Sequence, residues 1–230
     1  MHDVTTPFDE PNPWLTLPKH TPFVLATDAV AVERFNKTAV ASVRIELTLL
    51  PEPFVGRIDA PVVLLTLNPG VSDEDFALHE TPGFRDRVLR CHRQAPTEYP
   101  NYYLDPDVAG PGARWLHRIT RPLVQEFGAR AVSSGLSLVE LFPYHSRRFA
   151  HGAVRVPSKA YTIAIAQAAI RRGAAIFITR GRELWYKSVP ELRNCPRVFF
   201  TRSAQNIVIS PRNCPDGFSV VADAIRKSNG

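Results

Sequence analysis

Residues 62–70 read VVLLTLNPG, and this stretch decides the fold class. A short, almost continuous apolar run that ends in a turn is typical of a parallel strand buried on both faces. Asn-Pro-Gly is good turn chemistry, because proline fixes φ and glycine tolerates positive φ. Just beyond it, Ser72 precedes Asp73, Glu74 and Asp75. A capping residue followed by an acidic turn favours the start of a helix.

The alternation of apolar strand and helix continues from this stretch to the C-terminus. Helices are expected over 84–93, 113–127, 157–172, 182–186 and 218–227, and strands over 136–142, 174–179 and either 198–201 or 207–209. Such alternation indicates a parallel sheet covered by helices. We therefore predict an α/β protein, a three-layer α/β/α fold with a central, mainly parallel four-stranded sheet.

The chain before residue 62 is harder to interpret. Residues 1–24 are rich in proline and show little periodicity, which predicts an extended N-terminal arm lying on a single domain, residues 25–230. Asp28 is placed to cap a helix over 29–37. Residues 43–49 alternate between apolar and polar side chains, which is typical of an edge strand or of an extended crossing segment.

Composition limits the kind of protein. At 230 residues, with 44% hydrophobic and 22% charged residues, the chain fits one globular domain. It lacks an apolar run of membrane-spanning length, and its N-terminus does not have the pattern of a signal peptide, so we expect a cytoplasmic monomer with no membrane association. Three widely spaced cysteines without a Cys-x-x-Cys pair predict no disulfide framework, no metal and no cofactor.

The net charge of +6 suits a partner rich in phosphate, although many soluble proteins are mildly basic. Ligands of parallel sheets bind beyond the carboxyl ends of the strands. Three loops are expected to leave those ends and to converge, at 68–72, 140–148 and 210–216. Each loop also has an ordinary interpretation as a turn whose polar side chains bond to the local backbone.

Two of these loops together resemble a known family. Leu-Asn-Pro-Gly after the first buried strand and Ser-Pro-Arg-Asn after the last resemble the signature loops of the uracil-DNA glycosylase superfamily, in particular its single-strand-selective (SMUG-like) branch and a bacterial group with this fold. The resemblance runs from residue 62 to the C-terminus. It implies removal of a flipped base from single- or double-stranded DNA by hydrolysis of the N-glycosidic bond.

The resemblance also implies roles for the residues of these loops. Asn68 would position the attacking water, with Pro69 and Gly70 beside it against the substrate. In the second loop, the residues that would hold the leaving base or a phosphate are Ser210, Pro211, Arg212 and Asn213.

Two departures from the family pattern modify this expectation. Val208 stands where relatives carry a histidine that stabilises the departing base, and an apolar side chain cannot donate to an anion. Glu140 stands where relatives carry an asparagine that reads uracil, and a carboxylate would repel the O4 acceptor of uracil. We therefore expect a modified base rather than ordinary uracil. Glu140 is a candidate general base or base-reading group, or else a carboxylate paired with a nearby arginine.

The middle loop contributes three further candidates. Tyr144 is placed to read or stack on the base, Ser146 to bind substrate, and His145 to replace the missing donor as a catalytic group. The alternatives to these roles are that Tyr144 belongs to the core and that His145 is an ordinary surface residue. The leading prediction is a DNA base-excision N-glycosylase. Its competitors are a catalytically inactive nucleic-acid- or nucleotide-binding module of the same fold and a hydrolase of small nucleosides or nucleotides.

Overall fold

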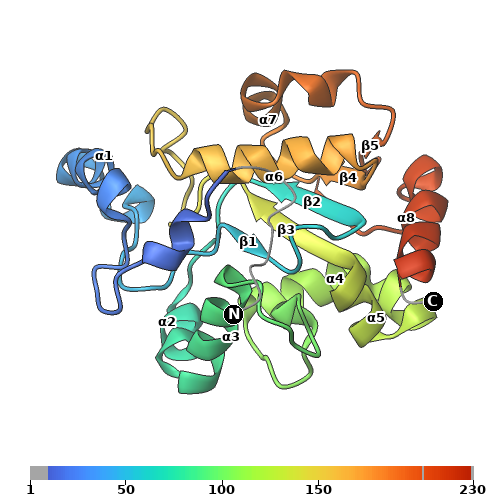
Figure 1. Cartoon of the computed structure of the whole chain (residues 1–230), viewed down its shortest axis with the longest axis horizontal. Coiled ribbons are helices and arrows are strands. Elements are labelled where there is room, and N and C mark those ends of the chain that lie inside the picture. The colour runs from blue at the N-terminus through green and yellow to red at the C-terminus, as the bar shows by residue number, and fades with distance from the viewer. Residues whose placement is uncertain (1–9, 204, 229–230) are drawn as a thin grey trace.

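A computed structural model describes residues 10–203 and 205–228 (Figure 1). Within these residues helices lie on both sides of a sheet; in the view of Figure 1, α6 and α7 lie above it and α4 and α5 below it. The α-helices of this described part are α1 (Ala26–Thr38), α2 (Asp73–Glu80), α3 (Pro82–His92), α4 (Pro111–Phe127), α5 (Ala129–Gly135), α6 (Lys159–Arg171), α7 (Arg182–Ser188) and α8 (Pro215–Ser228). Short 3-10 helices are η1 (Pro13–Thr16), η2 (Ala41–Val43), η3 (Tyr102–Leu104) and η4 (Pro190–Arg193).

The sheet has five strands in the order β1-β3-β2-β4-β5. Their bounds are β1 (Phe54–Val55), β2 (Val62–Thr66), β3 (Leu136–Glu140), β4 (Ala175–Ile178) and β5 (Val198–Phe199). Strands β3, β2, β4 and β5 are parallel, whereas β1 pairs antiparallel with β3. The α/β class is confirmed. The predicted strand count of four is corrected to five, because the two-residue strand β1 is too short to leave a periodic signal.

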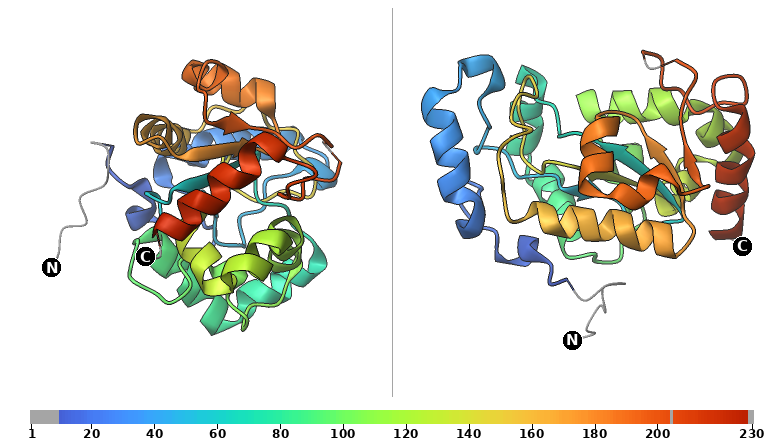
Figure 2. Two further views of the ribbon diagram at one scale, coloured as in Figure 1. Left: turned by 90° about the vertical axis from the view of Figure 1, so that its right-hand side faces the viewer. Right: turned by 90° about the horizontal axis from the view of Figure 1, so that it is seen from above.

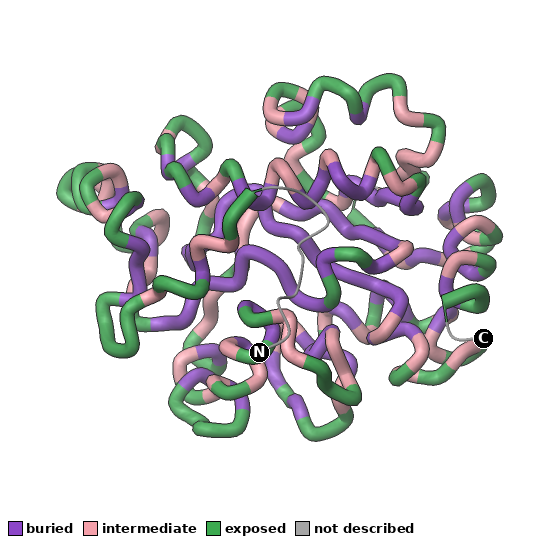
Figure 3. Tube along the Cα trace, in the orientation of Figure 1, coloured by how far each residue is buried: buried purple, intermediate pink, exposed green. Residues whose placement is uncertain are grey.

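Strand β2 lies at the centre of the sheet, as its apolar run predicts. All five of its residues are buried, and so are those of β3 and β4 (Figure 3). Its register with β3 places Thr66 opposite Glu140, so the polar ends of the two strands lie side by side. Helix α2 begins directly after Ser72, and the predicted capping box is present, with Asp75 accepting hydrogen bonds from the backbone and hydroxyl of Ser72.

Two local predictions near the N-terminus are corrected. Helix α1 begins at Ala26, so Asp28 lies within its first turn and is not the cap. The Asp28 carboxylate is buried and accepts instead from the Tyr144 hydroxyl, at 2.7 Å, and from the backbone of Ser158, at 3.0 Å. Residues 43–49 form no strand; they cross the domain and meet the sheet-end loops at one bridge, between Glu46 and His145. The extended crossing segment is the alternative that the structure supports.

A third correction concerns the last strand. Of the two candidates, 198–201 contains β5, while 207–209 lies in a loop. That loop crosses α4, where the backbone N–H of Ile209 donates to the carbonyl of Ile119 at 2.8 Å. The Ser-Pro-Arg-Asn loop therefore follows a crossing segment and not a strand end.

The described part of the N-terminal arm, residues 10–24, packs on the domain (Figure 2). Trp14 is buried, with its ring 5.8 Å from that of His92 and 6.0 Å from that of Tyr144. Phe23 is buried as well. The first nine residues of the expected arm lie outside the described residues. In the described part, no helix is long and apolar enough to cross a membrane.

Candidate functional site

A cavity of about 340 Å³ opens at the carboxyl ends of β2 and β3. Its volume lies at the lower end of the range typical of small-molecule sites. The residues around it come from the ends of β2, β3 and β4, from α2, from the start of α4, from η3 and from the segment before β1. They include Glu52, Thr66, Asn68, Pro69, Gly70, Asp75, Tyr103, Trp115, Glu140, Arg147 and Arg180. Two larger hollows, of about 610 and 470 Å³, are lined by Arg57 and Asp59, which neutralise each other through a bidentate ion pair. The smaller cavity is the one with buried ionisable groups at strand ends.

The amide of Asn68 is fixed in one orientation. Its Nδ2 donates to the carbonyl of Pro69 at 2.9 Å and to the hydroxyl of Ser146 at 3.0 Å. Because a carbonyl only accepts, the nitrogen must lie on this side. The Asn68 Oδ1 atom has no hydrogen-bond partner among the described residues, so an acceptor remains for a water or a ligand in the cavity.

Gly70 does not use the conformation expected of a turn glycine. Its φ is not among the positive values, and a Cβ built on it would meet nothing within 4 Å. The expectation that the turn needs glycine for positive φ is thus wrong. The open space beside Gly70 belongs to the wall of the cavity and leaves the backbone accessible to a ligand.

Glu140 is a buried acid on the cavity wall whose pKa is strongly raised. Its side chain is buried, and Oε2 has no hydrogen-bond partner among the described residues. Burial raises the pKa of Glu140 to about 8, while the neighbouring Thr66 side chain opposes the rise and the charge of Glu52 adds to it. At neutral pH the carboxyl is therefore mostly protonated and offers one donor and one acceptor.

The sequence offers three roles for Glu140: a general base, a base-reading group, or a carboxylate paired with an arginine. Arg180 lines the same cavity and lowers the pKa of Glu140, but the described residues contain no ion pair between the two. The argument that a carboxylate repels uracil assumes an ionised group. In its protonated form, Glu140 can donate to a carbonyl oxygen of a base.

Tyr144 does not line the cavity. Its ring is buried, and its hydroxyl donates to Asp28 and accepts from the backbone of Leu25 at 3.2 Å. The side chain therefore ties α1 to the middle loop. This is the core alternative, and the expected contact of Tyr144 with a base is corrected accordingly.

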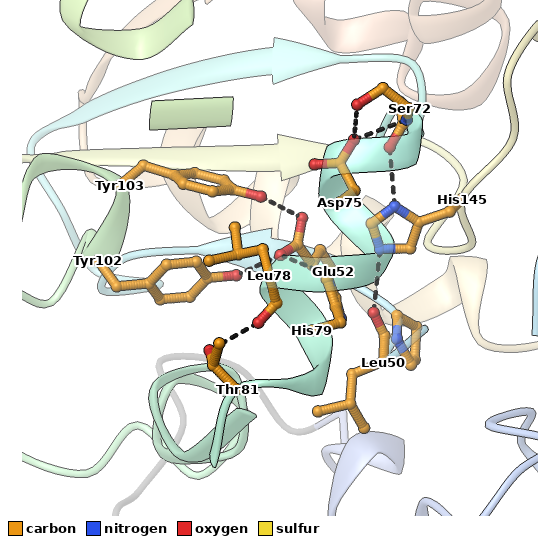
Figure 4. Close-up of polar contacts among 12 residues, drawn as sticks. Leu50, Glu52, Ser72, Asp75, Leu78, His79, Thr81, Tyr102, Tyr103 and His145 are labelled. Carbon is orange, nitrogen blue, oxygen red and sulfur yellow. Dashed lines mark hydrogen bonds and ion pairs between the residues drawn. The ribbon is translucent and has the colours of Figure 1, made fainter. Parts of the chain in front are cut away.

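His145 and Ser146 are buried behind the cavity wall and also do not line it. The two ring nitrogens of His145 lie 2.9 Å from the carbonyl oxygen of Gly70 and 3.0 Å from that of Leu50 (Figure 4). Ser146 accepts from Asn68 and donates to the carbonyl of Arg148. These two residues hold the Asn68–Gly70 turn in place, so the expected direct contacts of His145 and Ser146 with substrate are replaced by contacts with that turn.

His145 also belongs to a buried cluster with Glu52 and His79, whose potential metal-ligating atoms lie within 4.8 Å of one another. Figure 4 shows the group beside α2, with His79 on the last turn of that helix. Glu52 accepts from the hydroxyls of Tyr102, at 2.9 Å, and Tyr103, at 2.7 Å. Because both nitrogens of His145 already contact carbonyl oxygens, a metal would have to displace one of these contacts. As arranged, Glu52 is held by two tyrosine hydroxyls and His145 by two backbone carbonyls, and among the described residues no hydrogen bond joins the three cluster members.

The second loop lies apart from the cavity. Asn213 donates through Nδ2 to the carbonyls of Asn206, at 2.6 Å, and Val208, at 2.9 Å, and its Oδ1 accepts from the backbone of Ser203. Its backbone N–H contacts the Ser210 hydroxyl at 3.2 Å. Pro211 and Arg212 are exposed, and none of the four predicted residues lines the cavity. The loops at 68–72 and 140–148 both contribute to the cavity, as expected, and the loop at 210–216 does not.

Several cavity residues escaped the sequence analysis. Arg180 lies two residues after the end of β4, so the rule that sites form at carboxyl ends of strands could have found it. Glu52 precedes the unexpected strand β1, and no local pattern marks it. The sequence pattern marks Asp75 only as part of the first turn of a helix, and Trp115 only as part of the apolar face of a helix.

Comparisons of the chain with protein-family models, with curated proteins and with solved structures give no match.

Proposed function

We propose that this protein is a DNA N-glycosylase that hydrolyses the bond between deoxyribose and a modified base. The observation that carries the proposal is the pairing, on one cavity, of a rigid amide acceptor at Asn68 with a buried, unpaired carboxyl at Glu140. The first group can orient a water and the second can contact a base. Neither a metal nor an organic cofactor is part of the proposal.

The arrangement supports a division of roles. A water bound to Asn68 Oδ1 would be held in a defined orientation, and such positioning can contribute orders of magnitude to a rate. Tyr103 and Trp115 add aromatic faces on which a flipped base can stack. Arg147 and Arg180 supply positive charge for the flanking phosphates. His145 and Ser146 act by holding Asn68.

The fold is consistent with this proposal. Four parallel strands lie between helices, with the cavity at the carboxyl end of the central strand β2, as the resemblance to the uracil-DNA glycosylase superfamily implies. We infer a three-layer uracil-DNA glycosylase-like fold, extended by the antiparallel strand β1. DNA is the inferred partner, the protein is inferred to act as a monomer, and the cytoplasm is the inferred location.

One observation favours a second candidate, a binding module without catalytic activity. Of the groups predicted to stabilise a leaving base, His145 is behind the wall and Arg212 is in the separate loop. A module of this kind would hold a nucleotide or an extruded base in the same cavity and release no product.

The deciding experiment measures release of free base from single- and double-stranded oligonucleotides that carry uracil, hypoxanthine, xanthine, or oxidised or alkylated bases. We expect release of at least one modified base, lost in Asn68→Ala. Glu74→Gln, an exposed carboxylate on α2 that pairs with Arg114, is the control. Tight binding of an oligonucleotide without release of any base would reject the glycosylase and favour the binding module.

A further inference from the structure

The interior of the cavity is acidic, whereas its cations are more exposed. Three carboxyl groups on the wall are buried, with residue exposures of 3% for Glu52, 9% for Asp75 and 8% for Glu140. By contrast, the side chain of Arg147 is 49% exposed and pairs with Asp73. A ligand that enters the cavity meets carboxyl groups at its inner end and positive charge farther out.

Three side-chain hydrogen-bond donors of the inner wall are already committed to protein acceptors. The Tyr103 hydroxyl donates to Glu52, the Thr66 hydroxyl to the carbonyl of Val139 at 3.2 Å, and Asn68 Nδ2 to its own turn. Acceptors, in contrast, remain available at Asn68 Oδ1 and Glu140 Oε2. The inner wall is therefore complementary to a group that donates hydrogen bonds or carries positive charge.

From this distribution we propose that the cavity selects a positively charged, planar base, an N-alkylated pyrimidine or purine. The inference rests on the proposed function for its setting in DNA. The carboxyls would balance the charge of the base, while Tyr103 and Trp115 offer ring faces, which attract cations. The outer arginines would face the phosphates that flank the extruded nucleotide.

Hydrolysis of such a nucleotide requires no hydrogen-bond donor for the leaving base, so it can proceed after the cation has displaced the proton of Glu140. The electron pair of the glycosidic C–N bond passes to the ring nitrogen, so the cationic base departs as a neutral molecule. The sugar carries the positive charge until the water held by Asn68 adds to its C1′ atom and releases one proton to solvent. Abasic DNA, neutral base and a proton account for all atoms and charges, and the step produces no base anion that needs a donor.

Calorimetric titration of the full chain with two nucleosides of matched shape tests the selectivity. 3-Methyl-2′-deoxycytidine carries a positive charge on its base, and 3-methyl-2′-deoxyuridine is its neutral counterpart with the methyl group in the same place. We expect the cation to bind at least about tenfold more tightly, since charges interact strongly in a cavity screened from water. Glu140→Gln should reduce the preference, and Glu74→Gln on the exposed face of α2 should retain it.

Cation binding should also expel the proton that Glu140 holds. Titrations in two buffers of different ionisation enthalpy would show proton release near pH 7.5 for the wild type and none for Glu140→Gln. Equal affinity for the two nucleosides, or tighter binding of 2′-deoxyinosine than of the cation, would overturn the inference. Circular dichroism of each variant checks that it folds.

The outcomes separate this inference from the proposed function, because binding of free nucleosides requires no bond cleavage. A retained preference for the cation without any base release would reject only the glycosylase. Release of hypoxanthine without a preference for the cation would reject only the selectivity proposed here.

Discussion

The first and second loops contain similar turn sequences, Asn-Pro-Gly and Ser-Pro-Arg-Asn, and the structure uses them differently. In the first loop, Asn68 lines a cavity and its amide bonds to its surroundings through nitrogen only. In the second, both ends of the Asn213 amide are bonded to the loop itself. The comparison shows that the groups a turn leaves free for binding depend on the segment before it. Asn68 follows a buried strand end, and Asn213 follows a segment that crosses α4.

Removal of the Asn68 amide should have the largest effect. In Asn68→Ala the water loses its acceptor, so we expect the rate of base release to fall at least about 100-fold at saturating DNA. Single-turnover release assays measure this directly. Asn213→Ala is the matched control and should retain its rate at a temperature well below its unfolding transition. An equal loss of rate in both variants would contradict the distinction between the loops.

The free energy of unfolding should show the opposite order, with the larger loss in Asn213→Ala and the smaller loss in Asn68→Ala. Asn213→Ala removes the bonds that close the second loop and leaves carbonyl oxygens without their donor, so unfolding free energy should fall by about 1–3 kcal/mol. Urea unfolding at pH 7 measures the change. If Asn213→Ala is as stable as the wild type, the second loop is held by other contacts and its asparagine is available for another role.

Glu140 predicts a pH dependence of stability. Its folded-state pKa of about 8 lies above the ordinary value of 4.5. Between these values the unfolded chain has lost a proton that the folded protein retains, so this group's contribution is present at low pH and is lost as pH rises toward 8. The slope approaches about 1.4 kcal/mol per pH unit.

Urea unfolding at intervals from pH 5.5 to 8.5 tests this dependence through the difference between wild type and Glu140→Gln. As pH rises, the free energy of unfolding of the wild type should fall steadily relative to that of Glu140→Gln. A difference that stays constant with pH would show that Glu140 is ionised in the folded protein, which would also remove the donor proposed for this side chain at neutral pH.

The smallest effect is expected at Arg212, which is exposed in the second loop. Arg212→Ala should change unfolding free energy by less than about 0.5 kcal/mol. If the loop contacts a DNA phosphate, the variant should bind DNA more weakly while keeping its maximal release rate, and the slope of log affinity against log salt should decrease by about one. A reduced maximal rate would instead show that Arg212 contacts the reacting nucleotide in the cavity.

The central strand and the start of α2 could be predicted because their signals are local. The apolar run at 62–67 and the cap at Ser72 lie within a few residues of the elements that they specify. The run at 207–209 has the same apolar character but packs across α4, and sequence alone does not distinguish these two kinds of burial. Strand β1 depends on pairing with a segment more than 80 residues away, which no local pattern reveals.

The candidate site was predictable only where it coincides with the end of a predicted strand. Glu140 ends β3 and Asn68 lies two residues beyond the end of β2, and the parallel register brings these strand ends to one edge of the sheet. Tyr144 and His145 lie only a few residues farther on, but the chain has turned inward there and both side chains are buried. Glu52 reaches the cavity through long-range packing, so its position could be seen only in the folded chain.

Trp115 on the cavity wall has a practical consequence. The chain contains three tryptophans, and the other two, Trp14 and Trp185, are buried and do not line the cavity, although the Trp185 indole donates to the carbonyl of Thr66. Replacing those two with phenylalanine would leave one indole whose fluorescence reports directly on the cavity. The arrival of a base could then be timed in a stopped-flow instrument, separately from any chemistry that follows, with the protein itself as the optical probe.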